Sequence, residues 1–382
     1  MRTVASLLIC LALAACAHAP APPSPDDLFQ DAAFAPPIER VDGDRVFELS
    51  EAMRQYARTE IAARARSLGR QQALVDALYQ RQHLMLEYDS AITRNASEAF
   101  EARRGNCLSL VIMTAAFAKE LGLQIEYRSA YLEETWSRSR DIVFRSGHVN
   151  VTLGARMVDY HHSVDSRTVT IDFLPADDLR GLRTRGIDEP TVVAMYLNNR
   201  AAEALVAGRV DDAYARAREA IRRQPSFLPA YNTLGVVYLR HGDAAAAERA
   251  LRRVLALEPA NTRAMSNLAL ALARLGRGAE AEQISQQLAR IEPHPPFHFF
   301  NLGQAAMERH DYAAARDWFA KEVARADYYH EFHYWLALAL FRLGDMDEAR
   351  KQLAQALEHS TTRTDRDLYA AKLAWIRSRP QP

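Results

Sequence analysis

The stretch that decides the fold is LPAYNTLGVVYLRHGDAAAAERALRRVLALEPAN, residues 228–261. It contains two apolar runs, and Pro259 follows the second run. Proline cannot continue a helix, because it lacks the backbone N–H and its ring clashes with the preceding turn, so the second run should end there. Gly235 and Ala247 are small enough to let the two runs cross closely. The stretch therefore predicts two closely packed helices.

The same pattern recurs at a constant spacing in the C-terminal part of the chain. Segments of 34 residues begin at residues 194, 228, 262, 296 and 330. A fixed period of this length indicates stacked helical repeats that bury their core against their neighbours. The residue types at these offsets resemble the tetratricopeptide repeat, although unit four has His310 where Gly is usual and Asp327 where Pro is usual. We expect an all-α solenoid over residues 191–382, with a last helix at 363–378 that covers the exposed end of unit five.

The resemblance implies that the solenoid binds a protein or peptide along a concave groove lined by the first helix of each unit. Three residues are the candidates for groove contacts: Asn232, Phe300 and Tyr334. His330 and His333 are three residues apart, but they lack a clear third and fourth ligand for a metal. We therefore expect no metal and no other cofactor.

The N-terminal part contains a cysteine in an informative setting. In RRGNCLSLVIMTAAFAKELG, residues 103–122, Cys107 follows Gly105, which permits a sharp turn, and Asn106. The run that follows is apolar on most sides, which predicts a buried helix. Free N–H groups and the helix dipole stabilise an anion at the first turn of a helix. The position of Cys107 therefore favours a nucleophilic thiolate.

A thiolate nucleophile needs a base and a group that orients the base. After Cys107 the chain turns to alternating apolar residues, typical of strands, in GHVNVTL and TVTIDFL. His148 begins the first of these strands and Asp172 ends the second, so adjacent pairing would bring Cys107, His148 and Asp172 together. Asp159 is closer to His148 in the sequence and is an alternative to Asp172.

These segments resemble the transglutaminase-like domain, which has a papain-like α+β fold. The resemblance covers about residues 80–175 and implies a domain over residues 38–190. It also implies that Cys107 is the nucleophile, that His148 is first a general base and then an acid, and that the aspartate fixes the histidine tautomer. The implied activity is acyl transfer of the protease, amidase or cross-linking type. The chain departs from the family in having no Trp directly after His148.

The first residues of the chain predict export. Arg2 is followed by an uncharged apolar run that is too short to span a bilayer, as in a secretory signal. The run ends in Leu-Ala-Ala-Cys16, which resembles the lipobox of bacterial lipoproteins. The resemblance implies a signal peptide over residues 1–16, lipid on Cys16, and an outer-membrane location facing the periplasm. An ordinary signal peptide, cut a few residues later, would also export the protein.

The proline, charge and cysteine content of the chain limit the kinds of partner that it can bind. Residues 17–37 contain 6 of the 16 prolines, which predicts an extended tether. Lys plus Arg equals Asp plus Glu at 48 each, so no basic excess points to nucleic acid. Cys10 lies in the signal and Cys16 would carry lipid, which leaves Cys107 without a disulfide partner. We expect membrane contact through the N-terminal lipid only.

Two classes of function remain open at the level of the sequence. The first is an envelope-anchored cysteine acyl-transfer enzyme whose repeats bind a protein or peptide. The second is a catalytically inert lipoprotein scaffold that assembles envelope proteins through its repeats.

The lipobox yields the first test. We expect Cys16→Ser to leave the protein unprocessed or mislocalised, because serine cannot accept the thioether-linked lipid. Wild-type protein should partition with detergent extracts of the outer membrane. Wild-type protein that is free in the periplasm and carries no lipid mass would contradict this expectation.

Overall fold

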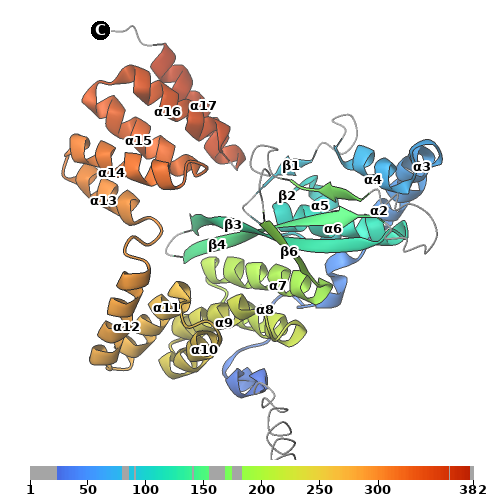
Figure 1. Ribbon diagram of the computed structural model, residues 1–382, viewed down its shortest axis with the longest axis horizontal. Coiled ribbons are helices and arrows are strands. Elements are labelled where there is room, and N and C mark those ends of the chain that lie inside the picture. Colours follow the sequence, from blue (N-terminus) through green and yellow to red (C-terminus); the bar gives the residue numbers. More distant parts are fainter. Residues whose placement is uncertain are drawn as a thin grey trace, which may run out of the picture.

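The computed structural model describes residues 24–79, 86–89, 92–139, 142–154, 168–173, 183–360 and 362–378, with the backbone alone at 79, 87, 130–139, 142–147 and 183. A part with a small sheet precedes a long stack of helices (Figure 1). Within these residues no helix is both long and apolar enough to cross a membrane. Cys16, the predicted signal peptide and Asp159 lie outside the described residues.

The N-terminal part begins with helices. Helix α2 (Glu51–Tyr56), a π-helical turn (Ala57–Ile61) and α3 (Ala62–Leu68) form one continuous segment, and α4 (Arg70–Tyr79) follows Gly69. Helix α5 (Ala96–Ala102) starts with the predicted capping box of Asn95 and Glu98. Two short strands, β1 (Glu87–Tyr88) and β2 (Arg104–Gly105), pair in parallel beside it. This pairing fixes the position of the residues directly before Cys107.

Helix α6 (Cys107–Glu120) is the central helix of this part. Every residue from 108 to 118 is buried, as the apolar pattern predicts. A four-stranded antiparallel sheet packs against it in the order β5-β4-β3-β6. The strands are β3 (Ile125–Ser139), β4 (Ile142–Leu153), β5 (Val169–Ile171) and β6 (Arg183–Ile187). The helix therefore has sheet on one side, where Val149 and Val151 are buried.

The sheet is larger than the sequence pattern indicated. The polar stretch EETWSRSRD, residues 133–141, has no apolar alternation, yet β3 runs through 139 and β4 starts at 142. Main-chain pairing of Ser139 with Ile142 closes this hairpin, and such pairing does not require apolar side chains. Strand β6 has no apolar alternation, and it pairs along β3 from Tyr127 to Tyr131.

The C-terminal part consists of helix pairs at the predicted spacing. The pairs are α7 (Glu189–Val206) with α8 (Val210–Arg223), α9 (Leu228–His241) with α10 (Ala244–Leu257), α11 (Thr262–Arg274) with α12 (Gly278–Ile291), α13 (His298–Glu308) with α14 (Tyr312–Arg325), and α15 (His330–Leu343) with α16 (Met346–Glu358). Helix α17 (Arg363–Arg377) covers the last pair, as predicted. His310 has a left-handed φ of +60° at the offset where the other units have glycine.

The stack is divided between α12 and α13. Successive helices pack extensively on each other elsewhere in the stack, but α12 and α13 make little contact, and the buried residues of α13 to α17 belong to separate clusters from those of α7 to α12 (Figure 1). The division changes burial at one repeat offset. Leu234 and Leu268 are fully buried against the preceding helix, whereas Leu302 at the same offset is 37% exposed. The period of 34 residues runs through this point without interruption, so the spacing alone could not reveal the division.

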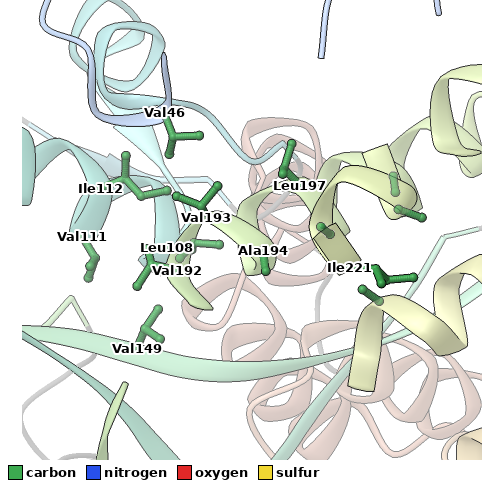
Figure 2. Close-up of a cluster of buried hydrophobic side chains, with 14 of the residues drawn as sticks. Val46, Leu108, Val111, Ile112, Val149, Val192, Val193, Ala194, Leu197 and Ile221 are labelled. Carbon is green, nitrogen blue, oxygen red and sulfur yellow. The ribbon is translucent and has the colours of Figure 1, made fainter. Parts of the chain in front are cut away.

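Helix α7 joins the two parts of the chain. It contacts α6 and β3 on one side and α8 and α9 on the other. Figure 2 shows Val192 and Val193 beside Leu108 and Ile112, with Leu197 farther along the same helix. One hydrophobic core therefore runs from the N-terminal part into the first repeats.

The described part of the predicted tether, residues 24–37, lies against the first repeats. Phe34 stacks on Tyr214 of α8, with ring centroids 3.9 Å apart. Leu28 is 3% exposed, and its carbonyl oxygen accepts a hydrogen bond from the Tyr238 hydroxyl. Two short 3-10 helices, η1 (Pro25–Leu28) and η2 (Asp31–Ala33), form along this path. The proline content predicted an extended tether here. It could not indicate this packing, because the aromatic partners are distant in the sequence.

The close crossing of α9 and α10 yields a stability test. A Cβ atom on Gly235 would lie 2.7 Å from the Leu251 side chain, which is fully buried and cannot move aside. We expect Gly235→Ala to lower the free energy of unfolding by about 1–3 kcal/mol.

Gly278 at the start of α12 is the matched control, because no atom lies within 4 Å of its added Cβ. Gly278→Ala should leave stability unchanged or raise it by up to about 1 kcal/mol. Urea unfolding followed by helical circular dichroism measures both effects. Equal effects of the two substitutions would contradict the close crossing.

Candidate active site

Cys107 is the first residue of α6, and its position is fixed by the turn before it. Asn106 caps the helix: its Oδ1 accepts hydrogen bonds from Ser109 N at 2.9 Å and from Ser109 Oγ at 2.7 Å. A Cβ on Gly105 would lie 2.6 Å from Ser109 Cβ, so glycine is needed here for space. Gly105 does not have a positive φ. The Gly-Asn-Cys sequence is therefore a close-packed helix cap that presents the Cys107 thiol at the helix N-terminus.

His148 and Asp172 come from neighbouring strands. Val151 pairs with Ile171, which places Asp172 opposite Asn150 and diagonal to His148. His148 Nε2 lies 2.7 Å from Asp172 Oδ1, and the two side chains are 3% and 5% exposed. Asn150 Nδ2 donates a hydrogen bond of 3.0 Å to the other carboxylate oxygen. The carboxylate is thus held by two donors in a buried setting.

The electrostatics of His148 link it to Cys107 as well. Burial alone would lower its pKa, but hydrogen bonds to Asp172 and Cys107 and the negative charges of both groups raise the pKa to about 9. Nε2 is used by Asp172, so Nδ1 is the ring nitrogen that remains for Cys107. The structure therefore brings Cys107, His148 and Asp172 together, with the imidazole between the thiol and the carboxylate.

Two further polar groups border this arrangement. Tyr88 pairs in register with Gly105, and loss of solvent around its hydroxyl and the nearby charges of Cys107 and Asp89 raise the pKa of Tyr88. Asn150 Oδ1 is buried and has no hydrogen-bond partner among the residues that the structure describes.

The three predicted groove residues have different surroundings. Phe300 is fully buried against Phe319 and Phe332, so the prediction that it faces the groove was wrong. Tyr334 is half-buried and stacks on Tyr369 of the last helix, with centroids 5.2 Å apart. Aromatic residues at one repeat offset therefore serve the core in unit four and the end helix in unit five.

Asn232 is half-buried on α9, beside α11, the first helix of the next unit. Its Oδ1 accepts a hydrogen bond of 3.0 Å from Asn267 Nδ2 in the next unit.

The histidines of unit five have protein partners. His333 is bonded through Nδ1 to Gln352 Oε1 and through Nε2 to the Asp327 carbonyl oxygen, both at 2.7 Å. His330 Nδ1 lies 2.8 Å from the Tyr369 hydroxyl. In the part of the chain that the structure describes, no group of three potential ligands among His, Cys, Asp and Glu could hold a metal.

Sequence reasoning missed part of the site. Asn106 was noted as a neighbour of Cys107, but its capping role was not recognised. Asn150 carried a usable signal, because it lies two residues after His148 and such residues share one face of a strand. Thr93, which holds Asn106 from a distant segment, carried no sequence signal.

Comparisons with known proteins identify the repeats. Residues 232–295 and 300–363 match the family model of the tetratricopeptide repeat, so the C-terminal part of the chain carries these repeats, as predicted. No curated protein sequence matches the chain.

Several solved structures resemble part of the chain. A thermophilic TPR protein of Thermus thermophilus is 20% identical, with a TM-score of 0.30 over 48% of this chain and 99% of that one. Pseudomonas aeruginosa pilF is 21% identical, with a TM-score of 0.29 over 48% and 84% of the two chains. YrrB, a TPR protein with an unusual peptide-binding site, is 18% identical, with a TM-score of 0.26 over 47% and 92%. Similarity at this level carries no conclusion about function.

The raised pKa of His148 predicts a pH-dependent stability. The folded state favours the imidazolium, because its pKa is about 9 there and 6.5 ordinarily. This stabilisation is full below about pH 6.5 and is lost as the pH rises through about 9. The difference in unfolding free energy between wild type and His148→Gln should therefore fall by up to about 3 kcal/mol over this range.

Asp172→Asn is the control for this measurement. This variant has no carboxylate beside His148. The unfolding free energy of Asp172→Asn should therefore depend less on pH between about 6.5 and 9 than that of wild type. A difference between wild type and His148→Gln that is constant from about pH 6 to 10 would contradict the raised pKa.

Proposed function

We propose that the chain is a cysteine acyl-transfer enzyme of the transglutaminase-like type, whose tetratricopeptide repeats recruit a protein or peptide substrate. The observation that carries the proposal is the position of His148, whose Nε2 lies 2.7 Å from Asp172 Oδ1 and whose pKa is raised by both Asp172 and Cys107. A buried histidine with both partners can stabilise a thiolate and can also transfer a proton. A cysteine that served the core alone would need neither partner.

The proposed reaction uses the described groups in two steps. The Cys107 thiolate attacks the carbonyl carbon of an amide, and a C–S bond forms. The His148 imidazolium gives its proton to the leaving amine as the C–N bond breaks, which leaves a thioester on Cys107. His148 then takes a proton from water or from an acceptor amine as that nucleophile attacks the thioester carbonyl carbon. The C–S bond breaks, and the Cys107 thiolate and the His148 imidazolium are restored. The Cys107 backbone N–H, at the start of α6, is suited to stabilise the oxyanion in both steps.

The order of elements supports the transglutaminase-like assignment. The nucleophile begins a buried helix, the histidine lies on a later strand, and the aspartate ends the strand next to it. Asp172 is the better choice for the third residue, because it is in direct contact with His148.

The repeats support a protein or peptide partner. The first unit is unavailable, because α7 is buried against α6 and β3. We propose that the partner binds farther along the stack, on the first helices that follow α7. A partner on α9 and α11 would lie on helices whose buried residues belong to the same hydrophobic core as α6, and this arrangement could deliver a peptide segment to the thiol.

The proposed setting is the bacterial outer membrane, facing the periplasm, with lipid on Cys16. The described part of the tether, residues 24–37, packs on α8 and α9. A lipid-anchored chain would therefore be held at the membrane from the side of the first repeats.

The alternative is an inert scaffold that assembles envelope proteins through its repeats. The observation that favours it is the valine that follows His148, where transglutaminase-like enzymes commonly have Trp. In that case the contacts among Cys107, His148 and Asp172 would be structural only.

Acylation by p-nitrophenyl acetate distinguishes the two functions. Attack by Cys107 forms an acetyl thioester and releases p-nitrophenolate, which can be followed by absorbance, while peptide mass spectrometry locates the acetyl group. Wild type should show a burst of p-nitrophenolate and acetyl on Cys107, and Cys107→Ala should show neither. His148→Ala should lose the burst, because no imidazolium stabilises the thiolate.

Asp172→Asn should retain a weak burst, because His148 keeps its place but loses its preferred tautomer. Far-ultraviolet circular dichroism checks that each variant is folded. A folded wild type without acetyl on Cys107 would support the scaffold instead.

A further inference from the structure

We propose that Thr93 is a positioning residue for Cys107, and that Arg200 and Glu203 of the first repeat helix hold it in place. The inference rests on the proposed function and adds a regulatory element to it. It connects the repeat array to the nucleophile through a chain of hydrogen bonds.

The main chain of Thr93 is held on both sides by α7. Its N–H donates to Glu203 Oε1 at 2.7 Å, and its carbonyl oxygen accepts from Arg200 Nη1 at 3.0 Å. Thr93 is 1% exposed, so these bonds replace water on both backbone groups. Arg200 and Glu203 also face each other at 3.7 Å, which balances their charges. The position of residue 93 is therefore set by a helix that lies more than 100 residues later in the chain.

The side chain of Thr93 sets the orientation of the helix cap. Thr93 Oγ1 accepts a hydrogen bond of 2.9 Å from Asn106 Nδ2. The Ser109 backbone N–H can only donate, so it requires Oδ1 on its side of the Asn106 amide, and the bond to Thr93 Oγ1 holds the other end of the amide in place. If the amide turned over, an N–H group would face the Ser109 N–H and the cap would be lost.

A second bond closes the network on the same helix turn. Arg94 N donates to Ser109 Oγ at 2.8 Å, and Ser109 Oγ donates to Asn106 Oδ1. Residues 93 and 94 therefore hold both ends of the Asn106–Ser109 cap. Cys107 lies inside this cap, so its thiol and its backbone N–H keep their direction only while the cap holds.

This arrangement couples the repeats to catalysis. Helix α7 is packed against α8 and α9, so a partner that shifts the first repeats also shifts Arg200 and Glu203. Loss of their bonds to Thr93 would release the cap and reduce the reactivity of Cys107. The rate at which Cys107 reacts therefore reports on the state of the first repeat.

The test is the second-order rate of Cys107 alkylation by iodoacetamide in the full chain, measured from about pH 6 to 9. Thr93→Val has the same shape but no hydroxyl, and we expect it to lower the rate about tenfold, the effect of one lost hydrogen bond. Thr93→Ser keeps the hydroxyl and should stay within about twofold of wild type. Glu203→Ala should resemble Thr93→Val, whereas Glu203→Gln keeps an acceptor oxygen and should resemble wild type.

Thr233→Val is the matched control. The Thr233 hydroxyl is 2.7 Å from Asn198 Oδ1 in the repeats, so this variant also loses a buried bond between threonine and asparagine. It should melt at a similar temperature to Thr93→Val but alkylate at the wild-type rate.

Two results would overturn the proposal: a folded Thr93→Val that alkylates at the wild-type rate, or an equal loss of rate in Thr233→Val. A different result would show that the proposed function fails while the positioning role holds. Wild type would form no acetyl thioester with p-nitrophenyl acetate. Thr93→Val would still alkylate more slowly than Thr233→Val.

Discussion

The structure depends on one helix that is buried on two sides. Helix α7 packs its apolar residues against α6 and β3 on one side and against α8 and α9 on the other, so that the N-terminal part and the first repeats share a single core. Val192, Ala194 and Ala201 are fully buried within this helix. Apolar surface buried on both sides of α7 stabilises both parts at once, at roughly 25 cal/mol per Å² of apolar surface removed from water. The first helix of the first repeat therefore packs against the N-terminal part, and we propose that partners bind to later units.

The candidate site follows from this packing. Because α6 is buried along eleven consecutive residues, its N-terminus is fixed, and the thiol of Cys107 lies at a defined place in front of β4. Antiparallel pairing of β4 with β5 then sets Asp172 beside His148, and Asn150 holds the second carboxylate oxygen. No single element carries the chemistry that we propose. It arises where a helix N-terminus, a strand centre and a strand end meet, and each of these is positioned by burial of apolar neighbours.

The sequence predicted features that depend on local pattern. The period of 34 residues predicted the repeats, the apolar run after Cys107 predicted a buried helix, and alternation around His148 and Asp172 predicted strands that bring them together. Features that depend on distant contacts were missed or misread. Phe300 has the offset of a groove residue but is buried against Phe319 of α14 and Phe332 of α15. Residues 24–37 have the composition of a spacer, but Phe34 stacks on Tyr214, which is distant in the sequence. Thr93 could not be foreseen, because its partners lie on α7 and no spacing records them.

The central claim is that folding places the Cys107 thiol at the start of α6 beside His148 and thereby makes it reactive. The most direct test compares the rate of Cys107 alkylation by iodoacetamide at about pH 6 in the native chain and in the same chain unfolded in urea, where an ordinary thiol is almost fully protonated. The account predicts that the native chain reacts at least about tenfold faster, because only the native chain places His148 and the N-terminus of α6 beside the thiol. A native chain that reacts more slowly than the unfolded one would contradict it, because Cys107 would then be a protected core residue.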